Sequence, residues 1–239
     1  MSTIHFFRHG QAGLRDDYDR LSELGHEQAA QLAEYVASER YSFDQVIVGG
    51  LRRQRETAEP VLAALDAAGM KPQLVVEDPG WSEFDLDIVF DGIAPRLAEE
   101  DEQFRREYEE IRRLVSSGDG HIHRRWTPAD AKVVKAWIEG RYTTHGESWL
   151  EFVERVRRAA AVFETLPHNA QVAVFTSATP VSICVAAAFG SQHPGHIMKL
   201  AGAAVNTNIT IVHNHQGDWH LAQFNAVPHL AEARLRTFR

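Results

Sequence analysis

The chain has 239 residues, of which 44% are hydrophobic and 24% are charged, so it is long enough to bury a sizeable core in one or two domains. Its formal net charge of −8 disfavours a nucleic-acid partner, and its apolar runs are shorter than the ~20 residues that span a bilayer. The single cysteine, Cys184, excludes an intrachain disulfide, and its apolar neighbours predict a buried, unreactive thiol. A strand is expected from residue 3 onward, so we expect no signal peptide and a cytoplasmic location.

Strands and helices alternate in the first half of the chain. Apolar runs predict strands at 3–7, 44–48 and 73–77, and amphipathic patterns predict helices at 21–39 and 52–69. This alternation is typical of an α/β fold with a largely parallel sheet.

The middle of the chain is more polar. A charged stretch at 96–117 is expected to be helical, and a loop is expected at 118–128. The apolar residues of the charged stretch recur at helical spacing and predict one packed face: Phe104, Tyr108, Ile111 and Val115. We therefore expect residues 88–146 to form a helical cap inserted into a single domain that spans 1–239.

The last third returns to alternating elements. An amphipathic helix is expected at 147–166, a buried strand at 171–177 and an apolar helix at 179–190. Residues 208–225 predict a hairpin that turns at Gln216-Gly217-Asp218.

The first strand ends on residues that suit phosphate chemistry. Arg8 supplies a permanent charge and a forked set of donors for phosphoryl oxygens. A neutral histidine such as His9 can attack phosphorus through its unprotonated ring nitrogen. Gly10 allows a sharp turn beside them. Ligands of open α/β sheets bind at this end of the strands.

The next two strand ends add further candidates. Arg52 and Arg53 open the helix at 52–69, where an anion is favoured, and Glu83, Asp85 and Asp87 form an acidic loop after the third strand. Taken singly, each group also fits a solvated surface. Together they supply a nucleophile, a phosphate clamp and a carboxylic acid that can donate a proton.

The order of motifs resembles the histidine phosphatase superfamily, in its phosphoglycerate-mutase-like branch (branch 1). The motifs are "RHG", "LSELGHEQA", "LRRxRxTAE", "WxE", "GES" at 146–148 and "FNxxxHL", and they cover nearly the whole chain apart from the cap. The resemblance implies a three-layer α/β/α sandwich around a mixed, mostly parallel sheet.

The resemblance also implies roles for individual residues. His9 would be the nucleophile and Glu83 the general acid and then the base, while Arg8 and Arg53 would clamp the phosphoryl oxygens. Arg53 fits the family better than Arg52 by its spacing to Thr57-Ala58. Neither a metal nor another cofactor would be needed.

One position departs from the family pattern. Ser177 stands in the Thr-Ser-Ala turn where the family has a second histidine that donates a hydrogen bond to the phosphoryl group. Loss of such a donor typically costs about 2.7–4 kcal/mol. Two explanations stay open. Hydroxyl groups of Thr176, Ser177 and Thr179, or the ring of His145, take over this task; alternatively, the chain binds a phosphorylated ligand without turning it over.

The sequence therefore favours a phosphomonoester hydrolase that acts on a small phosphorylated substrate through a phosphohistidine, without nucleic-acid or membrane partners. The alternative is a weak or inactive phospholigand-binding protein. A phosphoglycerate-type mutase has less support, because "QAGLRDDYDRLS" replaces the Asn- and Trp-containing stretch of the mutases. The sequence leaves the substrate and the oligomeric state open.

Other histidines carry weaker signals. The pairs His121/His123 and His213/His215 have a spacing that could serve zinc, but no third ligand is evident, so no metal site is predicted. His5 is expected in the core.

Overall fold

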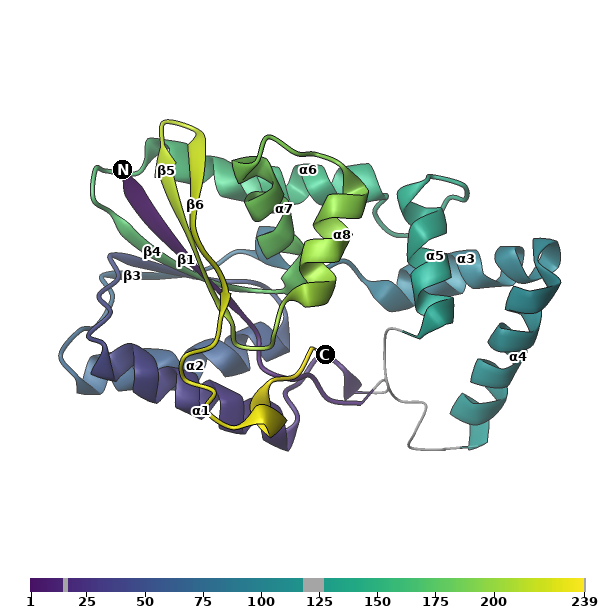
Figure 1. Ribbon diagram of the computed structural model, residues 1–239, viewed down its shortest axis with the longest axis horizontal. Helices are drawn as coiled ribbons and strands as arrows, with labels where there is room; N and C mark the ends of the chain where they lie inside the picture. The colour runs from purple at the N-terminus through teal and green to yellow at the C-terminus, as the bar shows by residue number, and fades with distance from the viewer. Residues whose placement is uncertain (15–16, 118–126, 239) are drawn as a thin grey trace. The chain divides into compact units, whose positions relative to one another are not determined.

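The computed structural model describes residues 1–14, 17–117 and 127–238, without the side chains of 115–117. A six-stranded sheet with the order β3-β2-β4-β1-β5-β6 is found among these residues (Figure 1). Neighbouring strands among β3, β2, β4 and β1 pair in parallel. The strand β5 pairs antiparallel with both β1 and β6, which confirms the mixed, mostly parallel sheet. The strands are β1 Ser2–Arg8, β2 Gln45–Val48, β3 Leu74–Glu77, β4 Gln171–Thr176, β5 Ile209–His215 and β6 Asp218–Ala226.

Helices cover both faces of the sheet and complete the three layers (Figure 1). One face packs against α1 (Glu23–Ser38) and α2 (Arg52–Ala67) through buried side chains such as Phe7, Leu32 and Val61. The other face carries α7 (Ala178–Ala188) and α8 (Pro194–Ala203). Successive residues of a strand point to opposite faces, so Phe7 stacks on Phe175 in one layer while Phe6 contacts Trp81 in the other.

Local sequence signals fix the start of α1 and its contact with the loop after β1. Ser22 caps α1 by accepting the N–H of Gly25, as its residue type favours. A Cβ on Gly10 would lie 2.6 Å from the carbonyl oxygen of Gly25, so only glycine allows this close approach of the loop after β1 to the start of α1.

The chain divides into two compact units. The first consists of residues 1–13, 18–83 and 155–239 and contains the sheet; the second consists of 14–17 and 84–154. The expected cap at 88–146 lies within the second unit, and its function as a cap stays a prediction.

The second unit contains three helices in its described part: α3 (Leu86–Glu100), α4 (Glu102–Ser117) and α5 (Pro128–Ile138). The helix α6 (Trp149–Ala160) begins there and continues into the first unit, where the short helix η3 (Ala161–Thr165) follows it. Buried rings of Phe84, Trp137 and Phe152 form an aromatic cluster within the unit.

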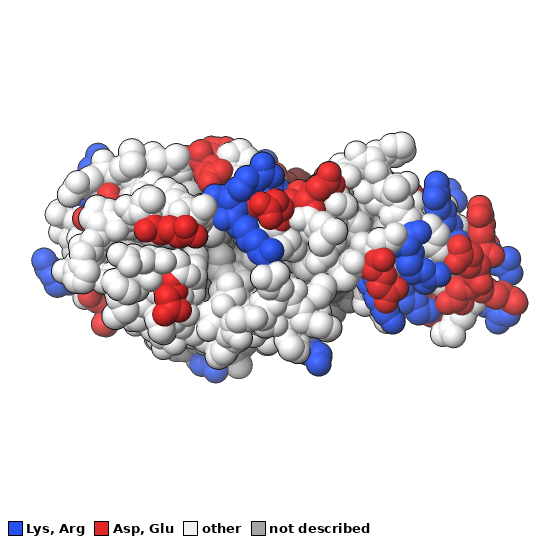
Figure 2. Space-filling model, turned by 90° about the horizontal axis from the view of Figure 1, so that it is seen from above, with Lys and Arg blue, Asp and Glu red and all other residues white. Residues whose placement is uncertain are grey.

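The charged stretch of the second unit differs in detail from its prediction. Asp101 interrupts it and caps α4, because its carboxylate accepts the N–H groups of Gln103 and Phe104. Phe104 is buried, whereas Tyr108 is half-buried. Ion pairs such as Arg106–Glu102 and Lys132–Glu107 make the surface of α4 a mixture of charges, visible at the right-hand end of Figure 2.

Several predictions about local structure were incomplete. Asp85 caps α3 and Asp87 lies in its first turn, so the acidic loop after β3 is shorter than expected. Ile111 is half-buried, whereas the side chain of Val115 and residues 118–126 of the expected loop lie outside the described residues. No helix among the described residues is both long and apolar enough to cross a membrane.

Candidate active site

Residues from four segments meet at the carboxyl edge of the parallel strands. Arg8 ends β1 and His9 follows it, Arg53 lies in the first turn of α2, Glu83 follows β3, and Ser177 follows β4. The cationic and imidazole groups are nearly inaccessible to solvent, with exposed fractions of 4% for Arg8, 2% for His9 and 5% for Arg53. Side chains far apart in the sequence are therefore gathered at one buried polar site, as expected for parallel strands.

The hydrogen bonds of His9 define which ring nitrogen carries the proton. Nδ1 lies 2.7 Å from the carbonyl oxygen of Gly10, which can only accept, so Nδ1 is the donor. Nε2 lies 3.1 Å from Nε of Arg53, which can only donate, so Nε2 presents its lone pair. This is the tautomer that a nucleophilic histidine needs.

The surroundings of His9 also keep the ring neutral. Burial, together with the guanidinium groups of Arg53 and Arg8, holds the pKa of His9 well below its usual value of 6.5. The lone pair on Nε2 is thus retained at neutral and mildly acidic pH.

The turn after β1 is tied to α2. The N–H of Gly10 donates to Oγ1 of Thr57 at 3.0 Å, and the hydroxyl of Thr57 donates to the carbonyl oxygen of Arg53 at 2.7 Å. Thr57 of the "TAE" motif thereby ties the turn after β1 to the first turn of α2.

The two neighbouring arginines of α2 differ in their surroundings. Arg52 is exposed and pairs with Glu56 at 2.7 Å, whereas Arg53 is buried against His9. Of the two, Arg53 contacts the ring of His9, and its role as a phosphate clamp stays a prediction.

Arg8 is held mainly by backbone carbonyl groups. Its guanidinium donates to the carbonyl oxygen of Ala204, and Nη2 donates to that of Phe238 at 3.3 Å. Its buried Nε has no hydrogen-bond partner among the described residues. A buried guanidinium with an unused donor is suited to an anion, because an unsatisfied buried donor is costly.

Glu83 is placed at the start of a helix. Its Oε2 accepts the N–H of Thr179 in the first turn of α7 at 3.1 Å. Arg155 in α6 donates to the carbonyl oxygens of Pro79, Gly80 and Ser82, and so holds the turn that precedes Glu83. This supporting role of Arg155 has no recognisable sequence pattern.

The hydroxyl groups after β4 have unequal roles. Thr176 donates to the carbonyl oxygen of Trp81 at 2.5 Å, so its proton is already used. Ser177 is fully buried and accepts a hydrogen bond from Nε2 of Gln54 at 2.9 Å. Because Ser177 accepts this bond, its own proton can be donated to a different acceptor. Thr176 therefore supports the turn, while the hydroxyl of Ser177 can still donate its proton.

Asn206 and Thr207, which no sequence pattern singled out, hold His9 through its backbone. The carbonyl oxygen of His9 accepts from Nδ2 of Asn206 at 3.1 Å and from the N–H of Thr207 at 3.4 Å. Thr207 has a left-handed φ of 55°, which is uncommon for a β-branched residue. Its hydroxyl lies 2.9 Å from Nε2 of His229, so the histidine of "FNxxxHL" supports this loop.

Asp19 was also missed. Its Oδ1 lies 2.9 Å from Nη1 of Arg53, and the ring of Tyr18 lies 4.9 Å from the guanidinium carbon of the same arginine. An acidic residue in a polar loop gives no sequence signal for such a contact.

The remaining candidates lie in other parts of the chain. His145 is exposed in the second unit, and its proposed compensating role stays a prediction. His121 and His123 lie outside the described residues. Within the described part of the chain, no group of three or more His, Cys, Asp or Glu residues could hold a metal ion. Burial raises the pKa of Cys184 to about 12, consistent with an unreactive thiol.

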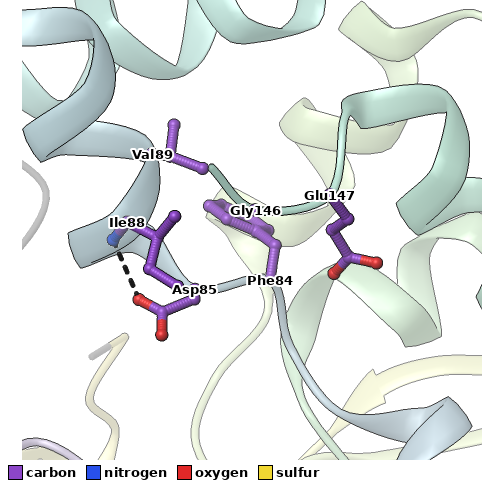
Figure 3. Close-up of a pocket in the computed structure, with 6 residues that line it drawn as sticks. All are labelled: Phe84, Asp85, Ile88, Val89, Gly146 and Glu147. Atoms are coloured by element: carbon purple, nitrogen blue, oxygen red, sulfur yellow. Dashed lines mark hydrogen bonds between the residues drawn. The ribbon is translucent and has the colours of Figure 1, made fainter. Parts of the chain in front are cut away.

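A small hollow occurs within the second unit, with a volume of about 210 Å³ (Figure 3). Phe84, Asp85, Ile88 and Val89 line it from the start of α3, and Gly146 and Glu147 line it from the segment before α6. Oδ1 of Asp85 is occupied in capping the helix, as the dashed line in Figure 3 shows. We assign this hollow no chemical role.

Buried histidines make the stability of the fold sensitive to acid. Burial lowers the pKa of His5 and of His229 to about 4, and that of His9 is lowered as well. The unfolded chain binds protons below about pH 6.5 that the folded chain does not. We therefore expect the free energy of unfolding to fall as the pH drops from 6.5 towards 4, by up to about 1.4 kcal/mol per pH unit for each of these rings.

Urea unfolding at a series of pH values measures this effect. His5→Phe is the internal control. It removes one of these rings, so the slope of the free energy of unfolding against pH should become smaller by the contribution of one proton. A free energy of unfolding that stays constant between about pH 6.5 and pH 4 would contradict the expectation.

The family of the chain follows from comparison with known proteins. A model of the histidine phosphatase superfamily (branch 1) matches residues 4–117 and 118–227. No curated protein matches the chain.

Solved structures share the fold at low sequence identity. An Escherichia coli protein provisionally assigned as an alpha-ribazole-5'-P phosphatase has a TM-score of 0.61 at 19% identity, over 95% of this chain and 98% of that chain. A mycobacterial glucosyl-3-phosphoglycerate phosphatase in complex with inorganic phosphate has a TM-score of 0.58 at 22% identity, over 96% and 99% of the two chains. A phosphoserine phosphatase mutant from Entamoeba histolytica in complex with phosphoserine has a TM-score of 0.55 at 17% identity, over 96% and 100%.

At these identities the solved structures show the fold alone. The family model covers most of the sequence, and the "RHG" motif that first pointed to phosphate chemistry lies in the buried polar cluster at the end of β1. The chain belongs to the histidine phosphatase superfamily, branch 1.

Proposed function

We propose that the chain is a phosphomonoester hydrolase that works through a phosphohistidine on His9. The observation that carries this proposal is the neutral His9 ring, whose Nε2 lone pair lies in a buried site beside the guanidinium of Arg53. The solved phosphatases of the same fold bind phosphoserine or inorganic phosphate, which supports a small phosphorylated substrate. The cytoplasmic location remains part of the proposal.

In the first step, Nε2 of His9 attacks phosphorus while the bond between phosphorus and the leaving oxygen breaks. Glu83, in its acid form, gives a proton to the leaving alkoxide. Arg8 and Arg53 neutralise the charge on the phosphoryl oxygens. For this step the Nε–H of Arg53, which lies 3.1 Å from Nε2 of His9 in this structure, turns to a phosphoryl oxygen.

In the second step, water attacks the phosphohistidine and Glu83 takes up its proton. The bond between phosphorus and Nε2 breaks, inorganic phosphate leaves, and His9 and the acid form of Glu83 are regenerated. No metal is required in this scheme, because guanidinium groups supply the positive charge.

The chemistry can be tested with p-nitrophenyl phosphate as the substrate. Release of p-nitrophenol and phosphate by the wild type supports hydrolysis. The alternative of a phospholigand-binding protein is motivated by Ser177, which stands where the family resemblance places a second histidine. It predicts that phosphate or vanadate raises the melting temperature while no product is released.

Ser177 should contribute to turnover as a hydrogen-bond donor. We expect Ser177→Ala to lower kcat about tenfold to a hundredfold, because a buried hydroxyl that can donate a hydrogen bond to the phosphoryl group in this scheme is lost. Ser177→His should raise kcat by supplying the donor of the family pattern, provided that the ring displaces the amide of Gln54 without unfolding the protein.

Two controls make the result on Ser177 interpretable. The melting temperature shows whether each variant is folded. His145→Ala should leave kcat unchanged if Ser177 is the donor, and a loss in this variant would transfer the role to His145. An unchanged kcat in folded Ser177→Ala would contradict the assignment.

A further inference from the structure

Asp19 lies where a phosphoryl oxygen would be favoured. Its Oδ1 contacts Nη1 of Arg53 at 2.9 Å, and its Oδ2 accepts the N–H of Arg52, the first residue of α2, at 3.2 Å. The carboxylate thus uses a guanidinium and a helix N-terminus at once. Both groups attract anions.

The exposures of the two partners are unequal. The side chain of Arg53 is 6% exposed, whereas that of Asp19 is 54% exposed. The arginine is therefore fixed in the buried site, and the carboxylate reaches it from a half-exposed position. Asp19 can move into solvent at small cost, because an exposed carboxylate is well hydrated and such pairs are worth little.

Arg53 divides its donors between internal partners. Nε donates to His9 and Nη1 donates to Asp19. Arg8 differs from it, because its guanidinium donates to the neutral carbonyl groups of Ala204 and Phe238. A phosphoryl dianion that binds Arg53 would come close to the carboxylate of Asp19, and the two negative charges would repel each other.

We infer that Asp19 is an internal competitor for the phosphoryl group, occupying Arg53 in the empty site and leaving it when a phosphorylated ligand binds. The inference rests on the proposed phosphate site. It assigns Asp19 control over the affinity for phosphate, and therefore over the release of inorganic phosphate as product. The opposite arrangement, in which Asp19 orients Arg53 for phosphate, predicts the opposite sign.

Titration calorimetry with inorganic phosphate distinguishes the two arrangements. Asp19→Asn keeps the shape of the side chain and removes its charge, so we expect the Kd for phosphate to fall about threefold to tenfold. The control is Asp66→Asn, at the other end of α2, where the exposed carboxylate of Asp66 pairs with Lys71 at 3.7 Å. This substitution makes the same change in net charge and should leave the Kd for phosphate unchanged.

The outcomes separate this inference from the proposed function. Unchanged or weaker binding in Asp19→Asn, with phosphate binding retained in the wild type, would overturn the role of Asp19 alone. Equal tightening in Asp19→Asn and Asp66→Asn would reduce the effect to net charge and also overturn it. Absence of phosphate binding in all three proteins would overturn the proposed phosphate site as well.

Discussion

Replacement of His9 by alanine should reduce the hydrolysis of p-nitrophenyl phosphate by about 10⁴-fold or more, because it removes the atom that forms the covalent intermediate. The substituted protein should still bind phosphate, since Arg8 and Arg53 remain. His26→Ala, which replaces an exposed histidine of α1, is the matched control and should retain full activity.

The dependence of wild-type activity on pH provides a second measurement. Burial and two guanidinium groups hold the pKa of His9 well below 6.5, so the nucleophile should not be lost through protonation near pH 6.

Residual activity of His9→Ala comparable to that of the wild type, in a protein that melts at the same temperature, would refute a phosphohistidine mechanism.

Glu83→Gln should have the second largest effect, and its size should depend on the leaving group. An alkyl phosphate needs a proton on its leaving oxygen, so we expect its hydrolysis to fall about 10²–10⁴-fold. p-Nitrophenolate leaves without a proton, so the first step with p-nitrophenyl phosphate should be affected much less. The second step still needs a base, and the phosphohistidine should therefore accumulate.

Asp85→Asn is a close control for Glu83→Gln. Asp85 lies two residues further along the chain and caps α3, a task that asparagine performs equally well. The control should have wild-type rates on both substrates. Equal losses of kcat/KM, which reports the first step alone, on alkyl and p-nitrophenyl phosphates in Glu83→Gln would contradict a role as general acid.

Much of the fold was predictable because the relevant signals are local. The apolar runs at 3–7, 44–48 and 171–177 recur as β1, β2 and β4, and Gln216-Gly217 adopts the positive φ angles expected for its turn. The start of α3 and the whole of α8 were missed. Their apolar patterns are short and come after Asp85 and Pro194. The polar residues, glycine and proline in the same stretches also favour a loop, so no helix was predicted there.

The candidate site could be inferred from the sequence only at positions that lie at the ends of strands. Arg8 ends β1, while His9, Arg53 and Glu83 come after β1, β2 and β3, and parallel pairing brings such positions to one edge. The bond of Gln54 to Ser177, which are 123 residues apart, depends on packing and leaves no pattern. The contact of Asp19 with Arg53 depends on packing in the same way.

The most direct test of the central claim is the trapping of a phosphoryl group on His9. Wild type and Glu83→Gln would be mixed with p-nitrophenyl phosphate, quenched in base and analysed by mass spectrometry of the peptide that contains residues 6–12. We predict one phosphoryl group on His9, at higher occupancy in Glu83→Gln. Turnover without phosphorylation of His9 in either protein, or with the phosphoryl group on another residue, would contradict the account.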